Sequence, residues 1–280
     1  MTKTPPKAMT KTPTRSRTRS LVVGLTGLLL LTAACSGQST VTGRSTATDA
    51  PGGQGPSKTA TGSTAGPGLS KVLFLGDSIA AGEALPLAAA FKAGGVAFQS
   101  IAADGGGNVV GPFSDHNWKK LPQQITSAKP TAVVYQLTTY DWGSREEQRA
   151  AYDKLLTTVI GAGAKLVFVT APPIKPDDFY KPHMADLNRA PDAAQAVAAG
   201  SSGRAGVLDA HAVWGSTYQQ IKDGKADRSV DGIHTCPQGA ARFTSWLLTE
   251  LAKQFPGFTP AAPQSWANTG WSADKHFKGC

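Results

Sequence analysis

The chain has 280 residues, 40% of them hydrophobic and 17% charged, and its formal net charge is +9 at pH 7. Six of the 28 lysines and arginines, and none of the 19 acids, lie within residues 1–20, which leaves 22 basic side chains against 19 acidic ones in the rest of the chain. So mild a charge argues against nucleic-acid binding, and the length beyond the leader and linker described below suffices for one well-buried domain.

The first 35 residues have the order of an export signal. A basic, acid-free segment precedes the apolar run LVVGLTGLLLLTAA, which is short for a permanent membrane span. The following LTAAC resembles a bacterial lipobox, in which the cysteine is lipidated and becomes the mature N-terminus. We therefore predict a lipoprotein signal peptide over 1–35, lipidated at Cys35, with an ordinary cleaved signal as the alternative. The mature protein is then extracytoplasmic, attached to the outer face of the cytoplasmic membrane through this anchor only, or secreted.

Residues 36–69 are dominated by serine, threonine, glycine and proline. A segment of this composition lacks the apolar side chains needed to bury a core. We therefore predict a disordered tether between the lipid and a folded domain that begins near residue 70.

Short apolar segments alternate with helix-like segments from this point onward. Five segments are rich in β-branched and aromatic residues and apolar on both faces, at 71–76, 96–102, 131–137, 165–171 and 205–210. Helix-like segments lie at 144–161, 183–199, 211–222 and 237–255. This alternation predicts a three-layer α/β/α domain around a central, mostly parallel five-stranded sheet, with the active site at the carboxyl ends of the strands.

The first predicted strand runs directly into Gly-Asp-Ser within KVLFLGDSIAAGE, residues 71–83. A helix-compatible segment follows, so Asp77 or Ser78 can serve simply as an N-cap that satisfies free N–H groups. Alternatively, Ser78 is a nucleophile whose Oγ lies where helix N–H groups stabilise developing negative charge. A nucleophilic serine also requires a base, and the base requires an acid that orients it.

His234 is the strongest candidate for the base among the five histidines. It lies in SVDGIHTCPQGAARF, three residues after Asp231 and just before the last predicted helix. A tight turn through the intervening glycine lets the carboxylate reach Nδ1 of the imidazole, which leaves Nε2 free to accept the proton of Ser78. His211 also has an acid nearby, Asp209, but the strand pattern places both on one face, in a packing or capping role.

LFLGDSIAAG near the start of the domain and DGIH near its end resemble the first and last motif blocks of the GDSL/SGNH hydrolase superfamily. The resemblance covers 70–255 and implies a flavodoxin-like SGNH hydrolase domain there. It also implies that Ser78 is the nucleophile, that His234 is the general base and then the acid, and that Asp231 orients the imidazole. The segment DGIHTCPQGAARF is similar to SGNH domains of actinobacterial type, some of which accompany membrane acyltransferases.

The resemblance implies an oxyanion hole formed by the Ser78 backbone and two further blocks, which match less well. The glycine of the second block falls within AADGGGNVV, at Gly105 or, in the alternative register, Gly106. Alternatively, the three glycines only make a mobile loop and have no role in the oxyanion hole. The third block normally reads Gly-x-Asn-Asp, whereas TTYD in this chain aligns Tyr140 with the asparagine. Tyr140 can donate its phenolic O–H, and Thr139 can donate its hydroxyl.

Several residues on these strand-end loops are expected to contact the substrate: Asp77, Gly106, Thr139, Asp141 and Trp142. Trp142 and Tyr140, with Trp118 and Trp214, are also candidates for an aromatic wall against a sugar ring or an acyl chain. Core packing is the alternative for each tryptophan.

Once Cys35 is assigned to the lipid, Cys236 and Cys280 remain. In an exported protein such a pair indicates a disulfide, and so few cysteines do not suggest a metal site. The bridge would clasp the tail 256–280 to the loop that carries His234.

These observations lead to three functional hypotheses. The first is an exported, lipid-anchored serine esterase that hydrolyses an O-acyl ester, on a cell-envelope glycan or glycolipid, with no metal or organic cofactor. The second is an O-acyltransferase that passes the acyl group from serine to a sugar hydroxyl. The third is a non-catalytic glycan-binding protein on a degenerate SGNH scaffold, which the departure at Tyr140 favours. In each case we expect a monomer.

Overall fold

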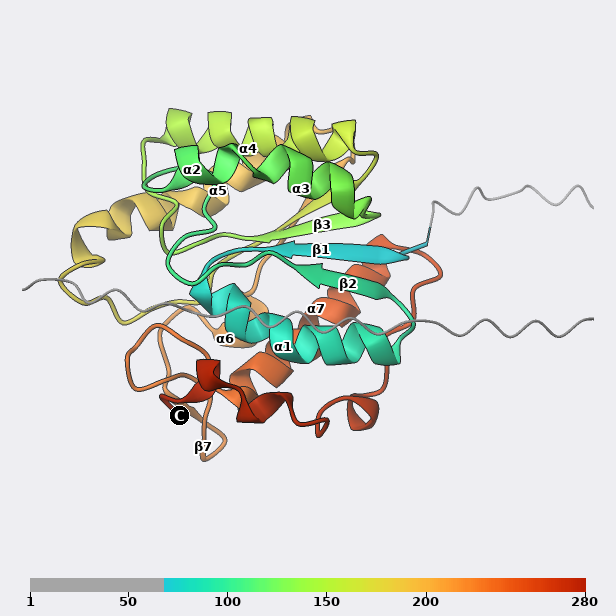
Figure 1. The fold of residues 1–280 in the computed structure, drawn as a ribbon. Coiled ribbons are helices and arrows are strands. Elements are labelled where there is room, and N and C mark those ends of the chain that lie inside the picture. The colour runs from blue at the N-terminus through green and yellow to red at the C-terminus, as the bar shows by residue number, and fades with distance from the viewer. Residues whose placement is uncertain (1–67) are drawn as a thin grey trace, which may run out of the picture. The chain divides into compact units, whose positions relative to one another are not determined.

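Residues 68–280 are described by a computed structural model. The predicted signal peptide 1–35 with its Cys35, and all but the end of the predicted tether 36–69, lie outside the described residues, so these remain predictions. In the described part, five parallel strands form one sheet between two layers of helices (Figure 1). The strands are β1 (Lys71–Leu75), β2 (Ala97–Ser100), β3 (Ala132–Gln136), β4 (Lys165–Val169) and β5 (Ala205–Leu208), in the order β2-β1-β3-β4-β5.

The predicted three-layer α/β/α architecture with a five-stranded sheet is confirmed, and alternate side chains of the buried strands feed two cores. In β1, Val72 and Phe74 face one core, and Leu73 and Leu75 face the other. The first core is covered by α1 (Ser78–Ala93), α6 (His211–Trp214) and α7 (Pro237–Gln254). The second is covered by α3 (Leu121–Ala128), α4 (Arg145–Gly161) and α5 (Met184–Gly200), with α2 (Ser114–Trp118) beside them (Figure 1). All five strands point the same way, so their carboxyl ends lie along one edge.

Three of the predicted helices match α4, α5 and α7 closely, whereas the helix predicted over 211–222 is wrong beyond its first turn. Helix α6 ends at Trp214 because Gly215 adopts a φ of 78°, a conformation that glycine accepts and other residues resist. The chain then forms a short hairpin of β6 (Ile221–Lys222) and β7 (Lys225–Ala226). Helices α2 and α3, between β2 and β3, were not among the predicted elements.

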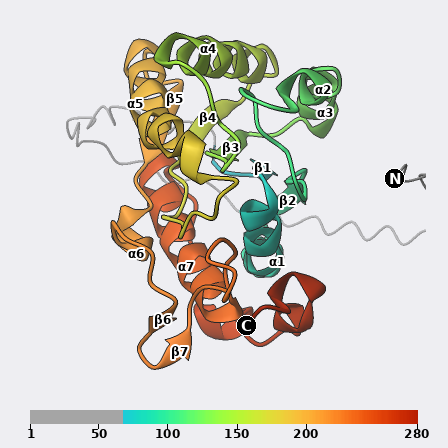
Figure 2. The same cartoon turned by 90° about the vertical axis from the view of Figure 1, so that its left-hand side faces the viewer.

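The tail after α7 returns along α1, where Figure 2 shows it beside that helix. It contains short 3₁₀ helices and places Trp266 in the first core. The predicted disulfide is confirmed, since Cys236 and Cys280 are bonded with an S–S distance of 2.04 Å. Within residues 68–280, no helix is both long enough and apolar enough to cross a membrane.

Candidate active site

The two polar residues in the turn between β1 and α1, Asp77 and Ser78, have different roles. Asp77 is the N-cap of α1, and its Oδ1 accepts a hydrogen bond of 3.0 Å from the Ile79 N–H. Ser78 is the first residue of the helix and is half-buried. A Cβ at Gly76 would lie 2.5 Å from the Cβ of Ala80, so the sharp turn requires glycine. The capping role therefore belongs to Asp77, and the Ser78 hydroxyl is left for other contacts.

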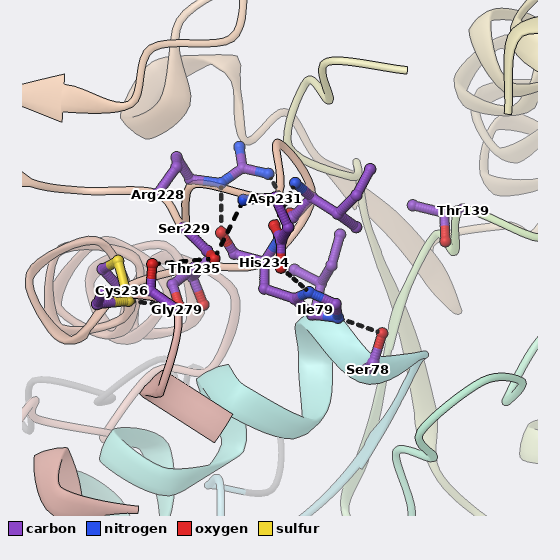
Figure 3. A network of polar contacts seen from close by, with 12 residues as sticks. Ser78, Ile79, Thr139, Arg228, Ser229, Asp231, His234, Thr235, Cys236 and Gly279 are labelled. Atoms are coloured by element: carbon purple, nitrogen blue, oxygen red, sulfur yellow. Dashed lines mark hydrogen bonds and ion pairs between the residues drawn. A yellow bond between two sulfur atoms is a disulfide. The ribbon is translucent and has the colours of Figure 1, made fainter. Parts of the chain in front are cut away.

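Ser78, His234 and Asp231 form one hydrogen-bonded chain (Figure 3). His234 Nε2 lies 2.9 Å from Ser78 Oγ, and His234 Nδ1 lies 2.8 Å from Asp231 Oδ2. The other carboxylate oxygen of Asp231 accepts the N–H groups of Ile233 and His234, at 2.8 and 3.0 Å. The three side chains predicted to act together are thus in contact, in the geometry that a nucleophile, a base and an orienting acid require.

The charge of Asp231 is set by these contacts. Partial burial acts to raise the pKa of Asp231, but hydrogen bonds from His234 and Ile233 outweigh it and lower the pKa to about 2. The carboxylate is therefore ionised at neutral pH and favours the tautomer of His234 that carries the proton on Nδ1. Gly232, with a φ of 81°, lets the turn pass close to the backbone of Lys175.

His211 forms a similar pair with Asp209, at 2.6 Å between Nδ1 and Oδ1. The same carboxylate oxygen accepts the backbone N–H of His211 at 3.0 Å, so Asp209 and His211 form a local turn at the start of α6. In the described structure, the imidazole that reaches Ser78 belongs to His234.

The second-block loop brings one of its glycines against the turn that precedes Ser78, whereas the donor role predicted for Gly105 stays a prediction. Gly105, the predicted donor, is exposed, and a Cβ added there would meet no atom within 4 Å. Gly107, with a φ of 78°, packs directly on the turn before Ser78, where an added Cβ would overlap the carbonyl oxygen of Gly76. Only glycine allows this approach, so Gly107 is the residue of the loop that geometry ties to the nucleophile. Gly106, the alternative predicted donor, is buried and lies between Gly105 and Gly107 in the chain.

Of the two candidate donors in the third block, Thr139 is already engaged. Its N–H and hydroxyl both donate to Asp77 Oδ2, at 2.7 and 2.8 Å. Tyr140 is half-buried, and its ring packs edge-on against that of Tyr180, with ring centres 6.1 Å apart. Burial, followed by the contact with Tyr180, raises the pKa of Tyr140, so its O–H stays protonated and can donate.

Two residues expected to contact the substrate are internal instead. Asp77 is 1% exposed and Asp141 is fully buried. Asp141 accepts hydrogen bonds from the hydroxyls of Tyr135, Tyr152 and Thr138, and burial outweighs these bonds and raises its pKa to about 6. The prediction is wrong for these two carboxylates, because their oxygens are used to hold the strand-end loops together.

The aromatic wall is also composed differently. Trp118 is half-buried on the second core and donates its Nε1–H to the Val109 carbonyl at 2.8 Å, and Trp214 is buried against Phe243, so both side chains serve packing. Tyr140 and Trp142 are joined instead by three side chains that were not predicted: Phe113, Phe179 and Tyr180. Phe113 and Phe179 are 55% and 53% exposed, so the cluster presents a ring surface to solvent. Exposed aromatic residues in loops are visible in the sequence, but their convergence is not.

The tail contacts loops on both sides of α1. Besides the disulfide, the Gly279 carbonyl accepts the N–H of Val230 at 3.2 Å, next to the loop that carries His234. On the other side, His276 Nε2 lies 3.3 Å from Asp104, which precedes the glycines of the second block. The tail therefore connects the two loops that flank Ser78.

Comparisons with known proteins identify the fold. No family model matches this chain, and no curated protein does. Among solved structures, a carbohydrate esterase family 3 protein from Talaromyces cellulolyticus is 17% identical, with a TM-score of 0.51 over 68% of this chain and 100% of the other. A GDSL-like lipase from Bacteroides thetaiotaomicron is 13% identical, with a TM-score of 0.50 over 66% and 88%. These neighbours are consistent with the predicted resemblance, and the chain has the fold of the GDSL/SGNH hydrolases.

Proposed function

We propose that this protein, which has the SGNH hydrolase fold, is a serine esterase that hydrolyses an O-acyl ester through Ser78, His234 and Asp231. The observation that carries the proposal is the continuous contact from Asp231 through His234 to Ser78 Oγ, with distances of 2.8 and 2.9 Å at the start of α1. The same edge of the sheet is where ligands of open α/β domains bind.

In the proposed acylation step, His234 Nε2 takes the hydroxyl proton while Ser78 Oγ bonds to the ester carbonyl carbon. The N–H groups of the first turn of α1 face the oxygen that becomes negatively charged, and Tyr140 adds a neutral donor. Collapse of this intermediate breaks the bond to the alcohol, which leaves with the proton from His234. Water then attacks the acyl-serine, giving its proton to His234, which returns it to Ser78.

The proposed substrate is an ester on a neutral, hydroxyl-rich molecule such as an envelope glycan or glycolipid. A pocket of about 500 Å³ opens at the carboxyl ends of β3 and β4 and includes Thr139, the partner of Asp77. Its lining combines apolar side chains with hydroxyl and amide groups and one histidine, His211, and includes no lysine, arginine, aspartate or glutamate. Apolar surface with a few neutral polar groups suits sugar rings better than ionic ligands. We also propose export and lipid anchoring at Cys35, which would hold the enzyme near such substrates.

A fluorophosphonate probe tests the reaction class. The mature protein should be labelled covalently, the label should map to Ser78, and Ser78→Ala should abolish it. Ser70→Ala, which alters an exposed serine just before β1, is the matched control and should be labelled like the wild type. Folded protein that takes no label would refute the proposal and favour the glycan-binding hypothesis.

An O-acyltransferase remains a second candidate, because the third block has Tyr140 in place of asparagine. Release of acyl groups from a model ester, measured with and without a glycan acceptor, separates the two. Product on the glycan, formed faster than free acid, would favour transfer.

A further inference from the structure

Arg228 is a buried cation close to the site, and nothing above gives it a role. Its side chain is 1% exposed and lies between two aromatic rings, 5.2 Å from the centre of Trp214 and 5.4 Å from that of Tyr218. Within residues 68–280, no carboxylate oxygen lies within 4 Å of it. Glu83, Asp227 and Asp231 act on it only from farther away. Burying a charge without a paired carboxylate costs free energy, so we ask what the guanidinium of Arg228 stabilises in return.

The guanidinium is used to hold backbone carbonyls of the loop that carries His234. Nε donates to the carbonyl of His234 itself at 3.3 Å, and Nη2 donates to the carbonyl of Ile233. Figure 3 shows Arg228 directly above this loop. The two carbonyls lie on either side of the His234 Cα, the atom that carries the imidazole side chain.

The third contact joins this loop to the opposite wall of the site. Nη1 donates to the carbonyl of Pro173 at 2.8 Å, in the segment between β4 and α5. That segment also supplies Tyr180, which packs with Ile79 and Ile233. A single planar group thus fixes the distance between the loop that carries the base and the segment that faces the nucleophile.

We propose that Arg228 is a positioning residue, which holds the imidazole of His234 in line with Ser78 Oγ through its three carbonyl contacts. This inference rests on the proposed esterase function. It requires the planar, forked shape of arginine, because a lysine ammonium is a compact charge that cannot span three divergent carbonyls.

The test compares Arg228→Ala and Arg228→Lys with the wild type in hydrolysis of 4-nitrophenyl acetate and in fluorophosphonate labelling. Displacement of a reacting group by about 1 Å can lower the rate about 100-fold. Arg228→Ala should therefore lose up to about 100-fold in kcat, and its KM should change little. Millimolar guanidinium should restore part of the lost rate in a saturable way by entering the vacated space between Trp214 and Tyr218, whereas ammonium should not. Arg228→Lys should stay impaired.

Arg204→Ala is the matched control. Arg204 also donates to a backbone carbonyl, that of Ser201 at 3.1 Å, but it lies just before the amino end of β5, at the far edge of the sheet. Its loss should leave kcat unchanged.

Wild-type kcat in either folded Arg228 variant would overturn the inference, as would a loss in Arg228→Ala that guanidinium does not relieve. If Arg228→Ala does not fold, Arg228→Lys decides in the same way. If the wild type itself takes no label, the esterase proposal fails instead. Hydrogen exchange of the 229–235 amides then still tests whether Arg228 holds the loop of His234. Faster exchange in Arg228→Lys supports this role, and unchanged exchange overturns it.

Discussion

The oxyanion hole can be tested by removing one hydroxyl at a time from the third block. Tyr140→Phe deletes only the phenolic O–H, and Thr139→Val replaces a hydroxyl by a methyl group of similar size. The structure distinguishes the two hydroxyls. Thr139 Oγ1 donates to the buried carboxylate of Asp77 at 2.8 Å, whereas Tyr140 belongs to the aromatic cluster, with its ring centre 6.1 Å from that of Tyr180. The two substitutions should therefore affect different properties.

Tyr140→Phe should act on catalysis. Loss of one oxyanion donor raises the barrier by about 2.7–4 kcal/mol, which is about 100- to 1000-fold in kcat. Because its pKa is raised above the ordinary tyrosine value, Tyr140 should keep this role across the neutral and mildly alkaline range.

Thr139→Val should act on stability. It removes a buried hydrogen bond to a carboxylate, which is worth about 1.5–3 kcal/mol, while the backbone N–H of residue 139 still bonds Asp77. The fall in kcat should be less than about tenfold, because this hydroxyl is not a free donor.

The assay measures kcat on 4-nitrophenyl acetate and the free energy of unfolding in urea for both variants. A reversed pattern, with Thr139→Val losing 100-fold or more and Tyr140→Phe near wild type, would refute the assignment drawn from these contacts. Full activity in both variants would mean that backbone N–H groups alone form the hole.

Three further predictions concern the loop of His234 and its clasp. Asp231→Asn should lower kcat by about 10⁴-fold, because an amide no longer enforces the Nδ1–H tautomer of His234. Steady-state kinetics should show this loss, and circular dichroism should show that the fold is intact. The lowered pKa of Asp231 means that the stability it contributes is present above pH 4 and is lost as the pH falls through 2. Solvent screening of this partly exposed group limits the contribution to about 1 kcal/mol. The urea midpoints of wild type and Asp231→Asn should therefore approach each other below pH 4 and coincide only near pH 2 and below. The double variant Cys236→Ala/Cys280→Ala opens a loop with a sequence separation of 44 and should lose about 4 kcal/mol of unfolding free energy, so an unchanged urea midpoint would contradict the clasp.

Much of the fold and the identity of the central residues follow from local features of the chain. Five apolar segments alternating with helical ones are enough to predict the sheet, because burial on both faces leaves a continuous apolar pattern. Asp231 and His234 lie three residues apart, so their pairing is a property of one turn. Two residues separate Ser78 from the end of β1, and the sequence alone identifies Asp77, next to Ser78, as a candidate helix cap.

The roles of several residues around the candidate site depend on contacts that only the tertiary structure shows. Thr139 donates to Asp77, which removes it as a free donor, and Gly107 rather than Gly105 packs against the turn before the nucleophile. Asp141 turns inward to two tyrosines, and Arg228 reaches across to Pro173. Such contacts depend on how strands and loops far apart in sequence are brought together by packing of the two cores. The direction that a loop side chain takes after a strand end is set by that packing, and no local pattern encodes it.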